Sequence, residues 1–298
     1  MHAVVTPFDA DGALDEAAFV SNVATYLDQG VNGIVLAGDN GEGWSLSDDE
    51  KVRLTELTRE LIDADRRQAK LVVGANSILT SGVIETTHKV ADAGADAVLV
   101  GPATHLVTAT QNEIIQRFES VASRGRLPIV LYNNPRRTHV NLTPDLVDRL
   151  ADIDGVVGLK DSGQDLGQFT ATLRRTRDRI NVMLGPCYFI FPAVLLGAAG
   201  YISSGPDVLG KAGVDYFAKL VAGDVTSTTS THFQLQRVSA AVNAAGTFPA
   251  GLKAAIELVG MRGGYPRLPI LPVSADARAT LRKALVDAGV LEGALVTA

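Results

Sequence analysis

PIVLYN (residues 128–133) and VVGLKD (156–161) are short apolar runs, rich in β-branched residues, that each deliver a polar side chain near their end. Such runs, apolar on both faces, are typical of strands in a covered parallel sheet. Six similar runs occur at fairly even spacing along the chain. They are HAVVTP (2–7), GIVLAG (33–38), KLVVGA (70–75), AVLVGP (97–102), NVMLGP (181–186) and GYISSG (200–205).

The segments between these runs have the period of amphipathic helices. Ser47 followed by Glu50 forms a capping-box pattern at the start of one of them. Eight strands that alternate with helices predict an α/β fold, a closed (βα)8 TIM barrel. An open doubly wound sheet is the alternative, but it usually has fewer strands and favours a Gly-rich turn after the first strand. The helical segments are 14–29, 47 onward, 84–93, 111–121, 143–150, 166–177 and 208–221.

The last part of the chain follows a different pattern. The polar run GDVTSTTST (223–231) is expected to be a connection, and the remainder is helical over 234–244, 250–259 and 275–288. We therefore predict a catalytic barrel over residues 1–225 and a C-terminal helical region, packed on the barrel, over 226–298.

Composition excludes several classes of protein. The net charge of −6 and the absence of a basic block argue against nucleic acid and anionic membrane as partners. The start has no basic region typical of a signal peptide, and the most apolar stretch, YFIFPAVLLGAAGYI, is too short to span a bilayer. The single cysteine, Cys187, excludes an internal disulfide and favours a cytoplasmic location.

Chemistry in such a barrel takes place at the carboxyl ends of the strands. Tyr132 and Lys160 end neighbouring strands, so both are expected to face the mouth of the barrel. A lysine among apolar residues such as Val157 and Leu159 loses its proton easily and becomes a nucleophile, and a phenol beside it can carry protons during imine formation. The alternative interpretation is that Lys160 is a lysine on the protein surface and that Tyr132 is a packed aromatic ring, neither with a role in catalysis.

Two further patterns bear on ligands. GDNGEGW (38–44) supplies glycines before a helix, where backbone N–H groups can receive a carboxylate, but it lacks the lysine of a nucleotide-binding loop. The five histidines show no metal-binding spacing. We therefore expect neither a metal nor another cofactor.

Four motifs in the same order resemble those of the dihydrodipicolinate synthase / N-acetylneuraminate lyase family. They are TPF with a following DG, GDNGE, YNNPRRT and GLKDSG, and they run across essentially the whole chain. The resemblance implies a (βα)8 barrel with a helical C-terminal part. It implies that the chain assembles with copies of itself, usually as a homotetramer and alternatively as a homodimer. It also implies class I chemistry, in which a lysine forms a Schiff base with pyruvate or another 2-oxo acid without a metal, and an aldehyde is the second small-molecule substrate.

The resemblance also implies roles for individual residues. Lys160 matches the Schiff-base lysine and Tyr132 the general acid/base. Asp39, Asn40 and Gly41 lie in the loop that holds the carboxylate of the 2-oxo acid. Arg137 matches the arginine that binds the carboxylate of the second substrate, and Ile202 matches the residue whose backbone carbonyl lies near the lysine.

The chain departs from the synthases at two places. They usually read GTTGE, with two hydroxyl groups in a proton relay, where this chain has Asp39 and Asn40. They also carry a tyrosine pair after the fourth strand, where this chain has Ala103 and Thr104. Asp39 and His105 are candidate substitutes in the relay, and a carboxylate at position 39 is expected to repel a second acidic group.

These features lead us to prefer a 4-hydroxy-2-oxoglutarate aldolase-like lyase, on the resemblance of the GDNGE loop, KDSGQD (160–165) and the C-terminal segment FPAGLKAAIELVGMRGGYPRLPILPVS to that branch. The alternatives within the family are 4-hydroxy-tetrahydrodipicolinate synthase, a sugar-acid dehydratase and a hydratase-aldolase. A non-catalytic barrel that binds a small acid is the alternative of another class, and a phosphate-handling barrel ranks last.

Overall fold

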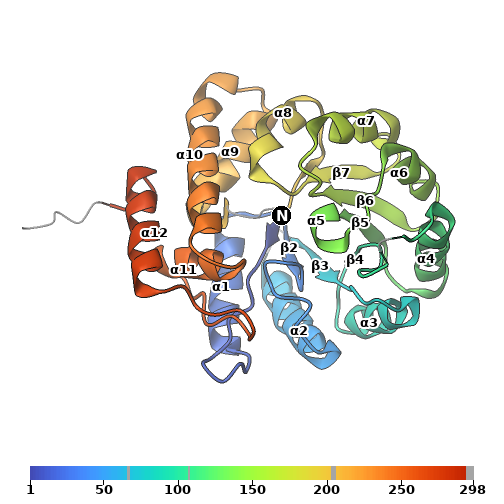
Figure 1. The fold of residues 1–298 in the computed structure, drawn as a ribbon, viewed down its shortest axis with the longest axis horizontal. Coiled ribbons are helices and arrows are strands. Elements are labelled where there is room, and N and C mark those ends of the chain that lie inside the picture. The colour runs from blue at the N-terminus through green and yellow to red at the C-terminus, as the bar shows by residue number, and fades with distance from the viewer. Residues whose placement is uncertain (66–67, 107, 203–205, 293–298) are drawn as a thin grey trace, which may run out of the picture.

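The computed structural model describes residues 1–65, 68–106, 108–202 and 206–292. Eight parallel strands form one sheet in the order β1-β2-β3-β4-β5-β6-β7-β8, so each strand pairs with the next in sequence. This is the expected (βα)8 barrel (Figure 1). The strands are β1 (His2–Ala3), β2 (Gly33–Leu36), β3 (Lys70–Gly74), β4 (Ala97–Val100), β5 (Ile129–Asn133), β6 (Val156–Asp161), β7 (Asn181–Leu184) and β8 (Gly200–Tyr201).

The first and last strands come together at the chain start, where the amino group of Met1 donates a hydrogen bond of 2.9 Å to the carbonyl of Tyr201. Both strands are shorter than expected. Beyond Ala3 the chain keeps one further bond to β2, from Val4 N to the carbonyl of Val35 (3.1 Å), before Pro7. The expected end of the eighth strand, 203–205, lies outside the described residues.

Helices follow the strands as predicted and surround the barrel (Figure 1). The capping box at Ser47 and Glu50 is present, with both reciprocal hydrogen bonds. Two short helices, α5 and α8, had no sequence prediction. The helices around the barrel are α1 (Glu16–Asp28), α2 (Asp48–Ala64), α3 (Thr80–Asp92), α4 (Gln111–Arg124), α5 (Pro135–Thr138), α6 (Pro144–Leu150), α7 (Leu166–Thr176), α8 (Ile190–Leu195) and α9 (Lys211–Val221). No helix among the described residues is long and apolar enough to cross a membrane.

Three helices follow the barrel: α10 (Val225–Ala244), α11 (Ala250–Leu258) and α12 (Ala275–Asp287). The prediction that GDVTSTTST is a polar connection is wrong, because α10 begins inside it. Asp224 caps this helix by accepting from the backbone N–H of Ser227, and Thr228 is buried. Helix α10 lies between α9 and α12 (Figure 1). The division of the chain at residue 225 stays a prediction.

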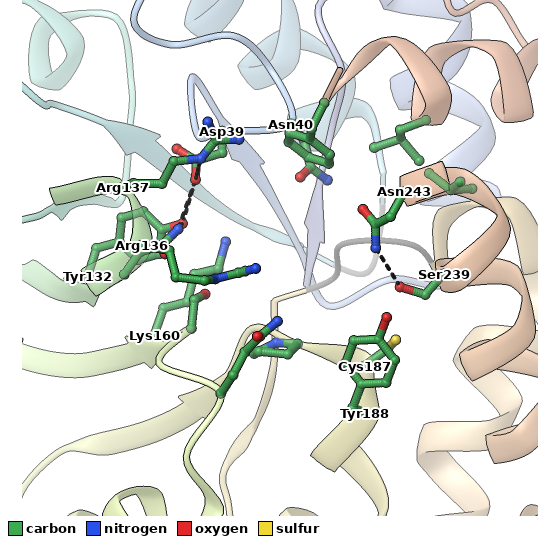
Figure 2. Close-up of a pocket in the computed structure, with 17 residues that line it drawn as sticks. Asp39, Asn40, Tyr132, Arg136, Arg137, Lys160, Cys187, Tyr188, Ser239 and Asn243 are labelled. Atoms are coloured by element: carbon green, nitrogen blue, oxygen red, sulfur yellow. Dashed lines mark hydrogen bonds and ion pairs between the residues drawn. The ribbon is translucent and has the colours of Figure 1, made fainter. Parts of the chain in front are cut away.

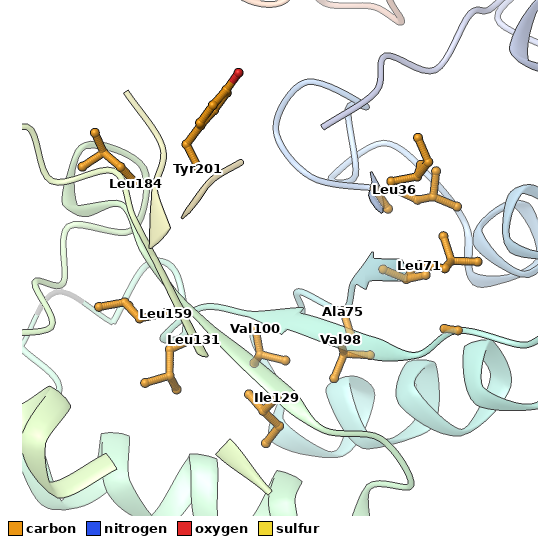
Figure 3. Close-up of a cluster of buried hydrophobic side chains, with 14 of the residues drawn as sticks. Leu36, Leu71, Ala75, Val98, Val100, Ile129, Leu131, Leu159, Leu184 and Tyr201 are labelled. Atoms are coloured by element: carbon orange, nitrogen blue, oxygen red, sulfur yellow. The ribbon is translucent and has the colours of Figure 1, made fainter. Parts of the chain in front are cut away.

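The alternation of side chains along each strand separates two apolar clusters. One cluster lies between strands and helices and includes Leu131 and Leu159 (Figure 3). The other fills the barrel interior and includes Val130, Tyr132 and Ile202. Odd and even positions of one strand therefore point to different sides of the sheet, one toward the helices and one into the barrel. A polar side chain reaches the barrel interior only from the second set of positions.

A buried ion pair ties the C-terminal helices to the loop after β2. The ammonium of Lys253 on α11 lies 2.5 Å from the carboxylate of Glu42, and both side chains are almost fully buried. The same ammonium donates to the carbonyl of Tyr265 at 2.6 Å. Burial lowers the pKa of Lys253 to about 8. Because removal of one partner leaves a buried charge alone, this pair holds the GDNGE loop firmly in place.

Candidate active site

The register between β5 and β6 places Tyr132 directly beside Lys160. Both side chains point into the barrel and are buried, at 5% and 4% exposure. The Lys160 Nζ lies 4.9 Å from the centre of the Tyr132 ring. A surface lysine with its nitrogen in open water is therefore ruled out.

The prediction that Val157 and Leu159 surround the Lys160 side chain is wrong. Val157 is 39% exposed, and Leu159 packs in the cluster outside the barrel. The reason is the period of two, since residues next to Lys160 in sequence point to the opposite face of the sheet. The neighbouring Asp161 also points outward, where it accepts hydrogen bonds from the backbone N–H of Gly163 (2.7 Å) and the amide of Asn133 (3.2 Å).

Tyr132 and Lys160 line a cavity of about 740 Å³ at the carboxyl ends of the strands. Figure 2 shows Asp39, Tyr132, Arg137 and Lys160 on one side of it and helix α10 on the other. Five of the eight predicted site residues line the cavity: Asp39, Asn40, Tyr132, Arg137 and Lys160. The other lining residues are Asn134, Arg136, Ser162, Gln164, Pro186, Cys187, Tyr188, Ser239, Val242, Asn243, Phe248 and Leu252.

A closed triangle of hydrogen bonds lies beside the lysine. The phenol of Tyr132 donates to Oδ2 of Asp39 at 2.9 Å (Figure 2). The amide of Asn134 donates to the same carboxylate oxygen at 3.1 Å and to the phenol oxygen at 2.8 Å. Burial, and next the charge of Asp39, raise the pKa of Tyr132 well above its ordinary value. The phenol therefore keeps its proton unless Asp39 takes it.

The loop after β2 is anchored by hydrogen bonds to β1 and to the segment that follows β1. Asn40 donates from its amide to the carbonyl of Ala3 at 2.6 Å, and Thr6 donates to the carbonyl of Gly41 at 2.8 Å. A Cβ at Gly41 would lie 2.9 Å from the carbonyl oxygen of Val4, so a larger residue does not fit this close approach. Gly41 itself is not among the residues that line the cavity.

Arg137 lies at the mouth of the cavity, 47% exposed, with its Nε 3.7 Å from Oδ2 of Asp39. Its guanidinium carbon is 5.6 Å from the ring centre of Trp44 and 5.7 Å from that of Phe248. The two rings and the carboxylate hold the guanidinium near the opening.

Two predicted residues lie away from the cavity. Ile202 is fully buried and belongs to the interior cluster with Tyr132. His105 was expected as a proton carrier, but within this chain the structure places it elsewhere. It lies on the loop after β4, where it contacts the Thr104 hydroxyl at 3.1 Å and lines a separate cavity with Leu106. His105 is not among the residues that line the cavity with Tyr132, so within this chain it is not placed to carry the proton of the phenol.

One wall of the cavity comes from residues that had no sequence prediction. Helix α10 contributes Ser239 and Asn243, whose side chains share a hydrogen bond of 3.4 Å, and α11 contributes Leu252. Their place beside the barrel rim depends on the packing of the C-terminal helices, and no motif marks it. Asn134, which lies directly after β5 within YNNPRRT, had no predicted role.

Among the described residues there is no group of three or more His, Cys, Asp or Glu side chains that could hold a metal ion. The metal-free mechanism stays a prediction. The chemistry available to this site is that of an amine, a phenol and a carboxylate in contact, which is suited to imine formation and proton transfer.

A (βα)8 barrel with a buried lysine beside a tyrosine at the rim is the arrangement of a class I, Schiff-base lyase. The chain belongs to the dihydrodipicolinate synthetase family, whose model matches residues 1–288. The predicted resemblance is thereby confirmed, and the protein is a lyase of this family.

The similarity of this chain to its relatives and to solved structures extends over nearly its whole length. A 4-hydroxy-tetrahydrodipicolinate synthase of Methanothrix thermoacetophila is 34% identical, with 98% of this chain and 97% of that protein covered. An uncharacterized DapA-like lyase of Rhizobium meliloti is 30% identical over 95% of this chain and 93% of its own length. The dihydrodipicolinate synthase structure from Thermotoga maritima superimposes with a TM-score of 0.91 at 31% identity, covering 97% and 98% of the two chains.

A further solved structure concerns the ligand. The dihydrodipicolinate synthase of Acinetobacter baumannii, solved in complex with pyruvate, has a TM-score of 0.90 and 30% identity, with 97% of this chain and 98% of that chain covered. The synthase names favour the alternative reaction that the sequence had placed second to the 4-hydroxy-2-oxoglutarate aldolase-like reading.

Proposed function

We propose that this protein forms a Schiff base between Lys160 and pyruvate or a related 2-oxo acid, and makes or breaks a carbon–carbon bond at C3. The observation that carries this proposal is the contact of Lys160 with Tyr132 inside the barrel, 4.9 Å from nitrogen to ring centre, at the wall of a cavity. Burial favours the neutral form of an amine, which is the form that attacks a ketone.

The reaction begins when the amine attacks the keto carbon and water leaves, which gives an iminium. Loss of a proton from C3 sends its electron pair into the C2–C3 bond and gives an enamine. C3 then bonds to the carbonyl carbon of an aldehyde, whose oxygen takes a proton, and water releases the product. The reverse sequence cleaves a 4-hydroxy-2-oxo acid.

Tyr132 and Asp39 handle the protons in this scheme. The phenol passes its proton to Oδ2 of Asp39, 2.9 Å away, as it accepts the proton from C3. This coupling suits a phenol whose pKa is raised by burial, because free phenolate need not form. Asp39 thus replaces the hydroxyl relay of the synthases.

The remaining predicted residues bind substrate. The loop at Asn40 and Gly41 receives the carboxylate of the 2-oxo acid, and we expect the backbone carbonyl of Ile202 to lie near the lysine. Arg137, at the mouth of the cavity, receives the distal carboxylate of the second substrate. The chain works as a homotetramer or homodimer, without a metal and in the cytoplasm.

For the particular reaction, the names of the relatives favour the condensation of pyruvate with aspartate semialdehyde, the reaction of 4-hydroxy-tetrahydrodipicolinate synthase. A second candidate is cleavage of 4-hydroxy-2-oxoglutarate, because the Asp39 carboxylate that accepts from Tyr132 stands where the synthases carry a hydroxyl group of their relay.

Two assays on the same preparation separate the candidates. Consumption of aspartate semialdehyde with pyruvate measures condensation, and release of pyruvate from 4-hydroxy-2-oxoglutarate measures cleavage. We expect one kcat/KM to exceed the other at least about a hundredfold, a difference that excludes the minor reaction as the function. Absence of both activities would contradict both candidates.

A further inference from the structure

Asn134 lies at a helix N-cap, a position where asparagine commonly serves only to start the helix. It follows β5 and precedes Pro135, at the N-cap of the short helix α5. Asparagine is favoured at such positions because its side chain can accept a hydrogen bond from the first turn. Here the side chain makes no capping bond. The helix start therefore does not explain why this side chain is turned inward and buried, at 4% exposure.

The contacts of the amide set the direction of a neighbouring hydrogen bond. Its nitrogen can only donate, and it does so to the phenol oxygen of Tyr132 at 2.8 Å and to Oδ2 of Asp39 at 3.1 Å. Since the phenol oxygen accepts from Asn134, its own hydrogen is left for the carboxylate, 2.9 Å away. One side chain thus fixes both the position of Asp39 and the orientation of the hydroxyl that acts with it.

The amide oxygen points to a ligand. Oδ1 of Asn134 is buried and has no hydrogen-bond partner among the described residues, although the side chain lines the cavity. A buried acceptor without a donor is uncommon in a protein. A hydroxyl or N–H group of a bound substrate, next to the phenol, is the donor that this position fits.

We propose that Asn134 is a positioning residue that holds the carboxylate of Asp39 against the phenol of Tyr132 and accepts a hydrogen bond from the bound substrate. The proposal rests on the Schiff-base function proposed above. It assigns a role to a residue of the YNNPRRT segment that had no predicted role, and it gives a reason that proton transfer in this chain needs an amide beside the carboxylate.

The experiment measures the exchange of the methyl protons of pyruvate with D₂O by NMR. This half-reaction needs the imine and proton transfer at C3 but no second substrate. Two variants keep the approximate shape of the side chain: Asn134→Leu removes all its hydrogen bonds, and Asn134→Asp removes the N–H donors and places a second carboxylate beside Asp39. The matched control is Gln168→Leu, which also removes an amide bonded to another side chain, Asn141, but lies outside the cavity.

We expect kcat for exchange to fall about 10- to 100-fold in both variants, the factor for one lost hydrogen bond to a charged group. KM for pyruvate should change less than about threefold in Asn134→Asp, which keeps an acceptor oxygen, and should rise further in Asn134→Leu, which has none. The control should keep the wild-type rate. If Asn134→Leu does not fold, Asn134→Asp alone tests the proposal. The thermal midpoint of Asn134→Asp and its trapping by borohydride at Lys160 show whether its fold and its site are intact.

A purely space-filling role predicts that Asn134→Asp keeps the wild-type kcat, and that result overturns the proposal. So does an equal loss of rate in Gln168→Leu. Failure of the proposed function gives a different result, since wild-type protein itself would then neither exchange the pyruvate protons nor be trapped by borohydride.

Discussion

Replacement of Asp39 with asparagine removes one charge beside Tyr132 and keeps the shape of the side chain. The carboxylate oxygen accepts two hydrogen bonds, from the phenol at 2.9 Å and from the amide of Asn134 at 3.1 Å. A hydrogen bond to a charged group contributes about 1.5–3 kcal/mol, roughly twice a neutral one. The variant keeps weakened bonds but has no group that can take the proton of the phenol.

We expect the exchange of pyruvate methyl protons with D₂O to slow by about 10²- to 10³-fold in Asp39→Asn. General acid–base catalysis typically contributes 10²- to 10⁴-fold, and a loss in the lower part of that range corresponds to about 3–4 kcal/mol. Imine formation at Lys160 should still reach completion when incubation is long, because the lysine itself is unchanged. NMR gives the exchange rate, and borohydride trapping followed by mass spectrometry gives the extent of imine formation.

The control for a changed net charge is Asp145→Asn, which removes an exposed carboxylate that is ion-paired with Arg175, and neither residue lines the cavity. It should exchange protons at the wild-type rate. If Asp39→Asn exchanges within about threefold of wild type while folded, Asp39 does not take the proton of Tyr132, and the relay argued from the triangle is refuted.

Four other outcomes follow from the site and its supports. Glu42→Gln should lower the free energy of unfolding by about 3–5 kcal/mol in denaturant titrations, because it leaves the Lys253 ammonium buried without its partner charge. Burial lowers the pKa of Lys253 to about 8, so the unfolded chain binds more protons above that pH. Stability from this group should therefore rise by about 2 kcal/mol between about pH 8 and 10, and the rise should be absent from Lys253→Met. The double variant Asp39→Thr with Asn40→Thr removes the proton acceptor and should lower both activities, but it should shift the ratio of kcat/KM for condensation with aspartate semialdehyde to kcat/KM for cleavage of 4-hydroxy-2-oxoglutarate about tenfold toward condensation. An unchanged ratio would show that Asp39 has no part in substrate choice. Dialysis against a chelator should leave pyruvate exchange unaltered, and a loss that zinc or magnesium restores would contradict the metal-free mechanism.

Most of the barrel and the centre of the site could be predicted from sequence for physical reasons. Each strand is short, apolar and followed by a helix, and parallel neighbours in a barrel share a rim. Tyr132 and Lys160 were therefore expected together, and the register of β5 and β6 places them side by side. The error over Val157 and Leu159 came from treating sequence neighbours as spatial neighbours in a strand, where they face opposite layers.

The rest of the site depends on contacts between distant parts of the chain. Asn134 meets Asp39 across 95 positions in sequence, and nothing local to either residue signals that contact. Ser239 and Asn243 reach the cavity because α10 packs beside the rim. The early start of α10 was missed for a related reason. A Thr- and Ser-rich run has low helix propensity, but its cap at Asp224 and the burial of Thr228 outweigh that preference.

The central claim is that Lys160 bonds covalently to the keto carbon of a 2-oxo acid. Incubation with pyruvate, reduction with borohydride and peptide mapping by mass spectrometry test it directly. The account predicts one reduced pyruvyl group per chain, on the peptide that contains Lys160, and none in Lys160→Met. An adduct on a different lysine, or an unmodified wild-type protein at saturating pyruvate, would contradict it.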